Sequence, residues 1–152
     1  MRDFNEEYKV IKNSLPQNAL ISLATCARNE VSARTMSAII IDGLFYFQTD
    51  SRSLKVLQLS LNANCAIAFN NYEITGHCEN LGHPMKEENK YIFKIFKEKF
   101  ESAASKYSHI EQELLFCVIP KTIKIWEYTD NGAQIVICDI KNKKISIEKL
   151  GY

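Results

Sequence analysis

Hydrophobic and polar positions alternate most regularly between residues 32 and 40. In an extended chain this places every second residue on one face, here Ser32, Arg34, Met36, Ala38 and Ile40. Asp42-Gly43 follows, a dipeptide typical of a two-residue hairpin turn, and residues 44–49 then predict a second strand rich in aromatic side chains. The turn at 49–53 offers hydroxyl and carboxylate groups that can cap a helix, and leucines at helical spacing predict that helix over 53–62.

The same patterns predict the rest of the fold. Helices are expected at 3–14, 87–100 and 101–107, and strands at 19–27, 65–70, 73–81, 114–128, 133–140 and 143–147. Pro120 within the longest strand implies an edge or a bulge at that point. Short turns join most strands, so we expect an α+β fold of mainly β type, a closed and mostly antiparallel barrel with helices over its openings. Helix 87–100 is interpreted as a surface helix that covers a barrel end. With no linker, residues 1–152 should form a single domain.

Composition narrows the function classes. A net charge of +1 gives no sign of a nucleic-acid or membrane partner, and no apolar run approaches the ~20 residues that cross a bilayer. The start, MRDFNEEYKV, lacks a secretory hydrophobic region, and the five cysteines contain no CxxC pair. We therefore expect a cytoplasmic protein with reduced cysteines that serve packing. His77 and Cys78 point to opposite faces of one strand, so no metal site is predicted, and no Ser/His/Asp or Cys/His set can be assembled from local spacing.

Arg34 and Lys55 are the candidates for ligand binding that the pattern itself provides. Lys55 lies in the first turn of the predicted helix, whose N-terminus carries unpaired N–H groups and partial positive charge that suit a phosphate. Arg34 is flanked by small residues, so its planar guanidinium has room to reach a ligand phosphate. The alternative is that Arg34 faces solvent and Lys55 is an ordinary helix-surface lysine.

Three segments together resemble the pyridoxamine 5'-phosphate oxidase-like family, the FMN-binding split barrels. They are residues 34–36 with the strand 44–49 and the helix 53–58 followed by Asn62, the glycine Gly76 in a mid-chain strand, and PKTIKIW at 120–126. The similarity runs from about residue 19 to residue 126. It implies a split-barrel fold that binds FMN.

The resemblance also implies roles for individual residues. Arg34 and Lys55 would hold the FMN phosphate, assisted by Ser53, and the backbone of Thr35 and Met36 would lie along the isoalloxazine ring. Hydrogen bonds to ribityl or ring atoms are assigned to Thr49 and Gln58. No catalytic residue is assigned, because the flavin itself would supply the redox chemistry.

Trp126 connects the expected cofactor to a second subunit. Small barrels fill their interiors with side chains, so FMN must lie outside, in a groove that the resembling family completes with a second chain. Trp126 alternates with Thr122 and Lys124 on the less apolar face of its strand, so it is either a lone surface aromatic or part of an interface and flavin contact. The resemblance implies a homodimer with Trp126 near the partner's flavin.

The sequence departs from the name-giving oxidase after Trp126. That enzyme carries an arginine- and histidine-containing segment there that binds its substrate, whereas residues 127–132 here are EYTDNG. We therefore expect an FMN-dependent oxidoreductase with another small substrate. The alternatives are a non-catalytic flavin-binding stress or sensor protein and a relative that binds haem or a deazaflavin. The lack of a basic stripe argues against a nucleic-acid module.

Overall fold

The computed structural model describes residues 3–150, which form one eight-stranded antiparallel sheet, four α-helices and a short 3-10 helix. The strands are β1 Asn18–Ala27, β2 Glu30–Ile41, β3 Leu44–Asp50, β4 Asn64–Phe69, β5 Tyr72–Asn80, β6 Glu113–Thr129, β7 Gly132–Asp139 and β8 Lys144–Leu150. The helices are α1 Phe4–Ser14, α2 Leu54–Leu61, η1 Glu87–Asn89, α3 Lys90–Lys99 and α4 Glu101–Tyr107.

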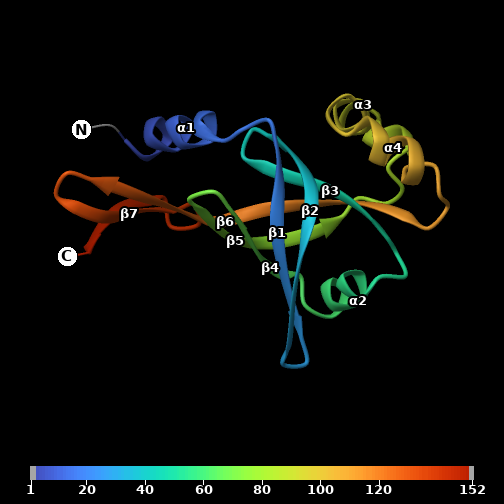
Figure 1. The fold of residues 1–152 in the computed structure, drawn as a ribbon, viewed down its shortest axis with the longest axis horizontal. Helices are drawn as coiled ribbons and strands as arrows, with labels where there is room; N and C mark the ends of the chain where they lie inside the picture. Colours follow the sequence, from blue (N-terminus) through green and yellow to red (C-terminus); the bar gives the residue numbers. More distant parts are fainter. Residues whose placement is uncertain (1–2, 151–152) are drawn as a thin grey trace.

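Six of the strands close into a barrel. The order along the sheet is β3-β2-β1-β4-β5-β6-β7-β8, and β3 also pairs with the first part of β6, which joins the two ends of the six-stranded portion. The second half of β6 continues past the barrel and pairs with β7, which pairs with β8, as an extension to the left in Figure 1. The predicted α+β split barrel is confirmed.

Alternation along each strand produces the barrel core. On β1 the inward residues Ile21 and Leu23 are fully buried. Leu20, which lies on the opposite face of the strand, is 66% exposed. Phe45 and Phe47 of β3 fill the centre of the same core. Helix α1 adds Ile11 to this core, its C-cap residue Leu15 adds a second side chain, and α2 adds Leu59, so both helices pack against the barrel interior.

Helices α3 and α4 occupy a different place from the one predicted. Residues 87–100 are divided into a 3-10 turn and α3, and α3 with α4 packs against the outer wall of β2 and β3, where Phe96 and Ala104 cover Ile39. The expectation that this helix covers a barrel end is wrong. The reason is that Ile39 and Ile41 point outward from β2 and need an apolar cover, which the amphipathic helix provides.

The bulge expected at Pro120 is present. The register between β5 and β6 shifts between Thr75 and Gly76, so that Thr75 pairs with Thr122 and Gly76 with Pro120. A Cβ atom at Gly76 would collide with the carbonyl oxygen of Ile119, which explains why the smallest residue stands there.

The five cysteines are free, as predicted, and four of them are buried. Within residues 3–150, no helix is long and apolar enough to cross a membrane.

Candidate functional site

The structure brings Arg34 and Lys55 together beneath α2. Arg34 points inward from β2, and Lys55 lies in the first turn of α2, the helix that packs on β1 at this side of the barrel. Burial lowers the pKa of Lys55, and the nearby positive charge of Arg34 lowers it further. Burial also lowers the pKa of Arg34. The site therefore holds two like charges close together in a partly desolvated place.

A hydrogen-bond network fixes the guanidinium of Arg34. Its Nη1 donates to the Oγ1 of Thr25 at 2.8 Å and to the carbonyl oxygen of Leu23 at 3.2 Å, both neutral acceptors. Thr25 in turn donates to the Oε1 of Gln58 at 2.5 Å. Gln58 is 3% exposed, and its Nε2 donates to Ser32 and to the carbonyl oxygen of Glu30. Gln58 thus lies with the predicted site residues, but its amide is engaged within the protein and positions Arg34 through Thr25.

The turn before α2 positions Lys55. The Nζ of Lys55 donates to the Oγ1 of Thr49 at 2.7 Å, and Thr49 is 6% exposed at the end of β3. Ser53 is the N-cap residue, but its side chain makes no capping hydrogen bond and lies 3.5 Å from the Thr49 hydroxyl. The expected capping by this turn is therefore not made by Ser53, which leaves its hydroxyl and the first N–H groups of α2 to bind an anion.

The carboxylates of Asp50 and Glu113 lie near Lys55. Asp50 accepts hydrogen bonds from the backbone and side chain of Arg52, which lower its pKa to about 2. Glu113 is paired with Asp50 across β3 and β6 and is 5% exposed. Burial raises the pKa of Glu113 to about 7, and the charge of Asp50 contributes to the rise. At neutral pH Glu113 is therefore poised between its two protonation states.

A small recess opens beside the outer face of β2. Its volume is about 160 Å³, and it lies between β2 and the helices α3 and α4. Eight residues line it: Thr35, Met36, Ser37, Gln48, Phe96, Ala103, Tyr107 and Glu113. The recess therefore adjoins Thr35 and Met36, the two residues expected to lie along the flavin ring.

Gln48 in this recess is a residue that the sequence reasoning missed. It is 9% exposed, and its Oε1 accepts a hydrogen bond from the hydroxyl of Ser108 at 2.6 Å. Its Nε2 is buried and has no hydrogen-bond partner within residues 3–150. The signal in the sequence was a glutamine among aromatic residues in LFYFQTD, but its neighbours Ser108 and Glu113 come from distant parts of the chain.

Trp126 lies apart from these residues. It lines a separate pocket of about 440 Å³ with Asn70 and Asn71 of the β4–β5 turn and with Tyr72, the first residue of β5. Across the sheet Thr35 pairs with Ser22, Ser22 with Ala68, Ala68 with Glu73, and Glu73 with Lys124, which lies two residues from Trp126. Four strand spacings of about 4.8 Å place the two ends of this ladder roughly 19 Å apart along the sheet. Trp126 and Thr35 therefore lie four strands apart on the wall and line different pockets of the chain.

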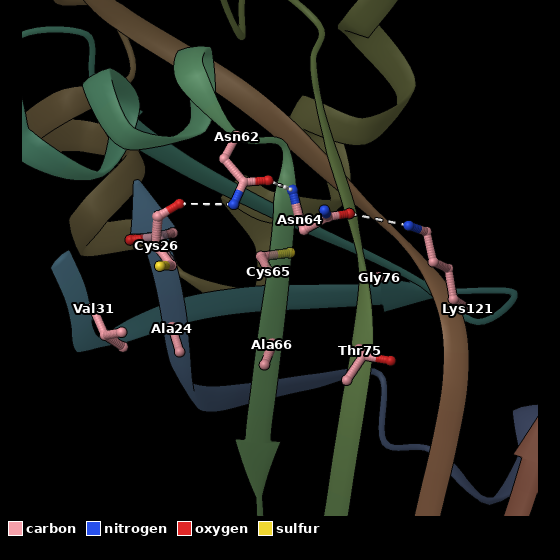
Figure 2. Close-up of a pocket in the computed structure, with 11 residues that line it drawn as sticks. Ala24, Cys26, Val31, Asn62, Asn64, Cys65, Ala66, Thr75, Gly76 and Lys121 are labelled. Atoms are coloured by element: carbon pink, nitrogen blue, oxygen red, sulfur yellow. Dashed lines mark hydrogen bonds between the residues drawn. The ribbon is translucent and has the colours of Figure 1, made fainter. Parts of the chain in front are cut away.

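A broader pocket lies on the outer wall between these two ends. It measures about 490 Å³, and Figure 2 shows Ala24 on β1 and Ala66 on β4 side by side at its floor, with Thr75 on β5 beside them. At its upper end Asn62 donates to the carbonyl oxygen of Cys26, and Lys121 donates to the Oδ1 of Asn64 (Figure 2). The polar groups at this end bond to one another, and the floor is made of small side chains.

The histidine and cysteine positions form no metal centre. His77 lies 3.7 Å from Glu79 on the outer face of β5, while Cys78 is buried on the inner face, as predicted from the alternation. Among the described residues, no group of three or more His, Cys, Asp or Glu side chains is placed to hold a metal ion.

Comparison with known proteins identifies the fold. No protein-family model matches the sequence, and no curated protein matches it. Solved structures do match. A pyridoxamine 5'-phosphate oxidase-related, FMN-binding protein from Nostoc punctiforme is 15% identical, with 97% of this chain and 95% of that one covered and a TM-score of 0.64. HutZ, the heme storage protein of Vibrio cholerae, is 12% identical, with 82% and 95% covered and a TM-score of 0.62. An F420 reductase is 14% identical, with 73% and 94% covered and a TM-score of 0.58. At these identities the likeness is one of fold, and the fold is that of the FMN-binding split barrels.

Proposed function

We propose that this protein binds FMN at the Arg34–Lys55 cluster and acts, as a homodimer, as a flavin-dependent oxidoreductase on a small molecule. The observation that carries the proposal is the pair of like charges held at the N-terminus of α2. A dianionic phosphate between them would remove their mutual repulsion and accept hydrogen bonds from both side chains. The Ser53 hydroxyl and the first N–H groups of α2 add donors at the same place.

The residues present fit such a cofactor on an independent ground. The unpartnered Nε2 of Gln48 is a buried donor, which is costly unless a ligand supplies an acceptor. Gln48 lines the recess next to Thr35 and Met36, the segment assigned to the ring. In this proposal the Arg34–Lys55 cluster would bind the phosphate, and the unused donor of Gln48 would lie near the ring.

Each group in the site has a separate task in this proposal. Arg34 and Lys55 bind the phosphate, while Thr25 and Gln58 hold Arg34 in place and Thr49 holds Lys55. FMN, when bound, supplies the redox chemistry, and the protein supplies orientation and electrostatics. Because such chemistry needs no nucleophile from the chain, the absence of a predicted triad is compatible with an enzyme.

A deazaflavin is the second candidate, since one of the structures with this fold is an F420 reductase. A phosphate-bearing deazaflavin would use the same cations, and haem is the third possibility because HutZ stores heme. The test is titration of the purified, cofactor-free protein with FMN, a deazaflavin and haemin, followed by absorption spectra of the desalted complexes. We expect FMN to be retained at one molecule per chain. Retention of haem or the deazaflavin in preference to FMN would overturn the cofactor assignment.

The homodimer is proposed because Trp126, which the resemblance assigns to the flavin of a partner chain, lies apart from the other assigned residues of its own chain. The outer wall carries Thr35 at one end and Trp126 at the other, roughly 19 Å apart along four strand spacings. A two-fold axis near the small-residue pocket between them would bring the partner's wall, running the opposite way, against this one. The Trp126 end of one chain would then meet the Thr35 end of the other. Leu20 and Val31, which are 66% and 74% exposed on this wall, would be buried.

Substitution of Ala66 by arginine is expected to separate the dimer. Ala66 lies at the floor of the pocket in Figure 2, and a long charged side chain there would be desolvated in the interface. Light scattering should give about twice the chain mass of 17.5 kDa for the parent protein and the single-chain mass for Ala66→Arg, with weaker FMN binding. Ser146→Arg on exposed β8 is the control and should remain dimeric. A monomer that holds FMN as tightly as the parent would contradict the shared site.

A further inference from the structure

The recess that contains Gln48 and Glu113 has features that phosphate binding does not use. Two of the polar side chains that line it are buried, Gln48 at 9% exposure and Glu113 at 5%. They come from β3 and β6, which pair with each other, and the remaining lining is mixed, with apolar Phe96 and Ala103 beside the hydroxyl-bearing Thr35, Ser37 and Tyr107. Two buried polar groups in a recess of about 160 Å³ with a mixed polar and apolar lining suit a small, flat, partly polar ligand group.

The hydrogen bonds already made determine what each group can still do. The Oε1 of Gln48 already accepts a hydrogen bond from the hydroxyl of Ser108. The Nε2 of the same amide is still available as a donor and requires an acceptor such as a carbonyl oxygen. An ionised carboxylate at Glu113 only accepts, so it requires a neighbouring N–H. A carbonyl next to an N–H is the edge of an amide or imide.

We propose that this recess binds the planar amide or imide edge of a ligand, with Gln48 donating to its carbonyl oxygen and Glu113 accepting from its N–H. Two sources of this chemistry exist. One is the pyrimidine edge of a flavin, in which case the inference rests on the proposed function and deepens it. The other is a small amide such as nicotinamide that binds independently of flavin.

The protonation state of Glu113 makes ligand affinity depend on pH, which provides a second measurement. Burial and Asp50 raise the pKa of Glu113 to about 7, whereas His83 and Lys55 oppose the rise. A ligand N–H stabilises the ionised carboxylate and so lowers this pKa on binding. By linkage, the affinity should increase as the pH rises through 7 and decrease below it.

The experiment uses the flavin-free protein and two probes, riboflavin and nicotinamide. Riboflavin is chosen because it lacks the phosphate, whose own ionisation would contribute to a pH profile. Because Gln48→Leu removes one buried hydrogen bond to the ligand, we expect it to lower the affinity for the probe that binds in the recess about tenfold. Gln17→Leu is the matched control, at an exposed glutamine that precedes β1. It should leave the affinities for both probes unchanged.

Glu113→Gln tests the carboxylate. The amide oxygen of the new side chain still accepts from an N–H, so binding should persist, but the dependence on pH should disappear. Glu148→Gln on exposed β8 is the control. Because His83 is one of the groups that lower the pKa of Glu113, the profile is also measured in His83→Gln, where the dependence on pH should remain. N3-methylriboflavin, which lacks the N–H, should bind the parent protein more weakly than riboflavin, and its affinity should not increase with pH.

The outcomes separate this inference from the proposed function. If riboflavin responds to Gln48→Leu and Glu113→Gln as described, the flavin itself supplies the edge; if only nicotinamide responds, a separate amide ligand does. This inference is wrong, while FMN binding stands, if riboflavin binds but neither variant changes the affinity for either probe. It is also wrong if the affinity falls as the pH rises through 7. If no flavin binds at all, the proposed function fails, and a nicotinamide response alone would still support the recess.

Discussion

Replacement of both Arg34 and Lys55 by methionine is expected to abolish tight FMN binding while leaving riboflavin binding nearly unchanged. Each charge-assisted hydrogen bond to phosphate contributes roughly 1.5–3 kcal/mol, so Lys55→Ala alone should weaken FMN binding about tenfold or more. Loss of both cations should cost about 3–6 kcal/mol, or about two to four orders of magnitude in Kd. The structure gives a reason for the pair to act together, since the charge of Arg34 lowers the pKa of Lys55 in the cofactor-free protein.

Fluorescence titration of the two single variants and the double variant, with FMN and riboflavin in parallel, measures this effect. Lys94→Met on the exposed side of α3 removes one charge far from the cluster and should leave both affinities unchanged. The melting temperature of the Arg34 variant is measured as well, because Arg34 also donates hydrogen bonds to Thr25 and to the carbonyl oxygen of Leu23, and its loss can lower stability. An equal loss of affinity for FMN and riboflavin would show that the cations do not bind the phosphate.

The flavin-loaded protein is expected to show negligible oxidation of pyridoxine phosphate or pyridoxamine phosphate. Such substrates carry a phosphate of their own and need cationic groups beyond those that hold FMN. In the hairpin after Trp126 the charged residues are Glu127 and Asp130, both acidic, and Glu127 accepts a hydrogen bond from Gln134 at 2.8 Å across β6 and β7. Loss of a charge-assisted contact in a closed site costs several kcal/mol, and hence orders of magnitude in kcat/KM.

A steady-state assay with pyridoxine phosphate and oxygen checks this expectation. Reduction of the bound flavin by dithionite, or by a nicotinamide donor, is the control that shows the loaded protein to be competent in electron transfer. Turnover within tenfold of a typical enzyme's ~10 per second would show that this hairpin does accommodate a phosphorylated pyridine.

Local sequence signals determined most of the secondary structure. The alternation in residues 32–40, the Asp42-Gly43 turn and the leucine spacing after Ser53 each depend on neighbours in the chain, and the structure has β2, β3 and α2 there. The bulge at Pro120 was likewise predictable, because a proline without an N–H disturbs any ladder it joins. The inward position of Arg34 follows from the same alternation, which groups it with Met36 and Ala38.

Only the tertiary structure decided how distant residues meet. Closure of the barrel between β3 and β6 brings Glu113 next to Asp50, and α4 brings Ser108 against Gln48; these pairs are separated by about 60 residues. No periodicity encodes such contacts, because they depend on packing between elements rather than on spacing within one. The place of α3 shows the same limit, since its amphipathic pattern revealed that one side is buried but not which surface covers it. The sequence thus determined the barrel strands and the two cations, whereas burial and sheet closure determined the recess and the raised pKa of Glu113.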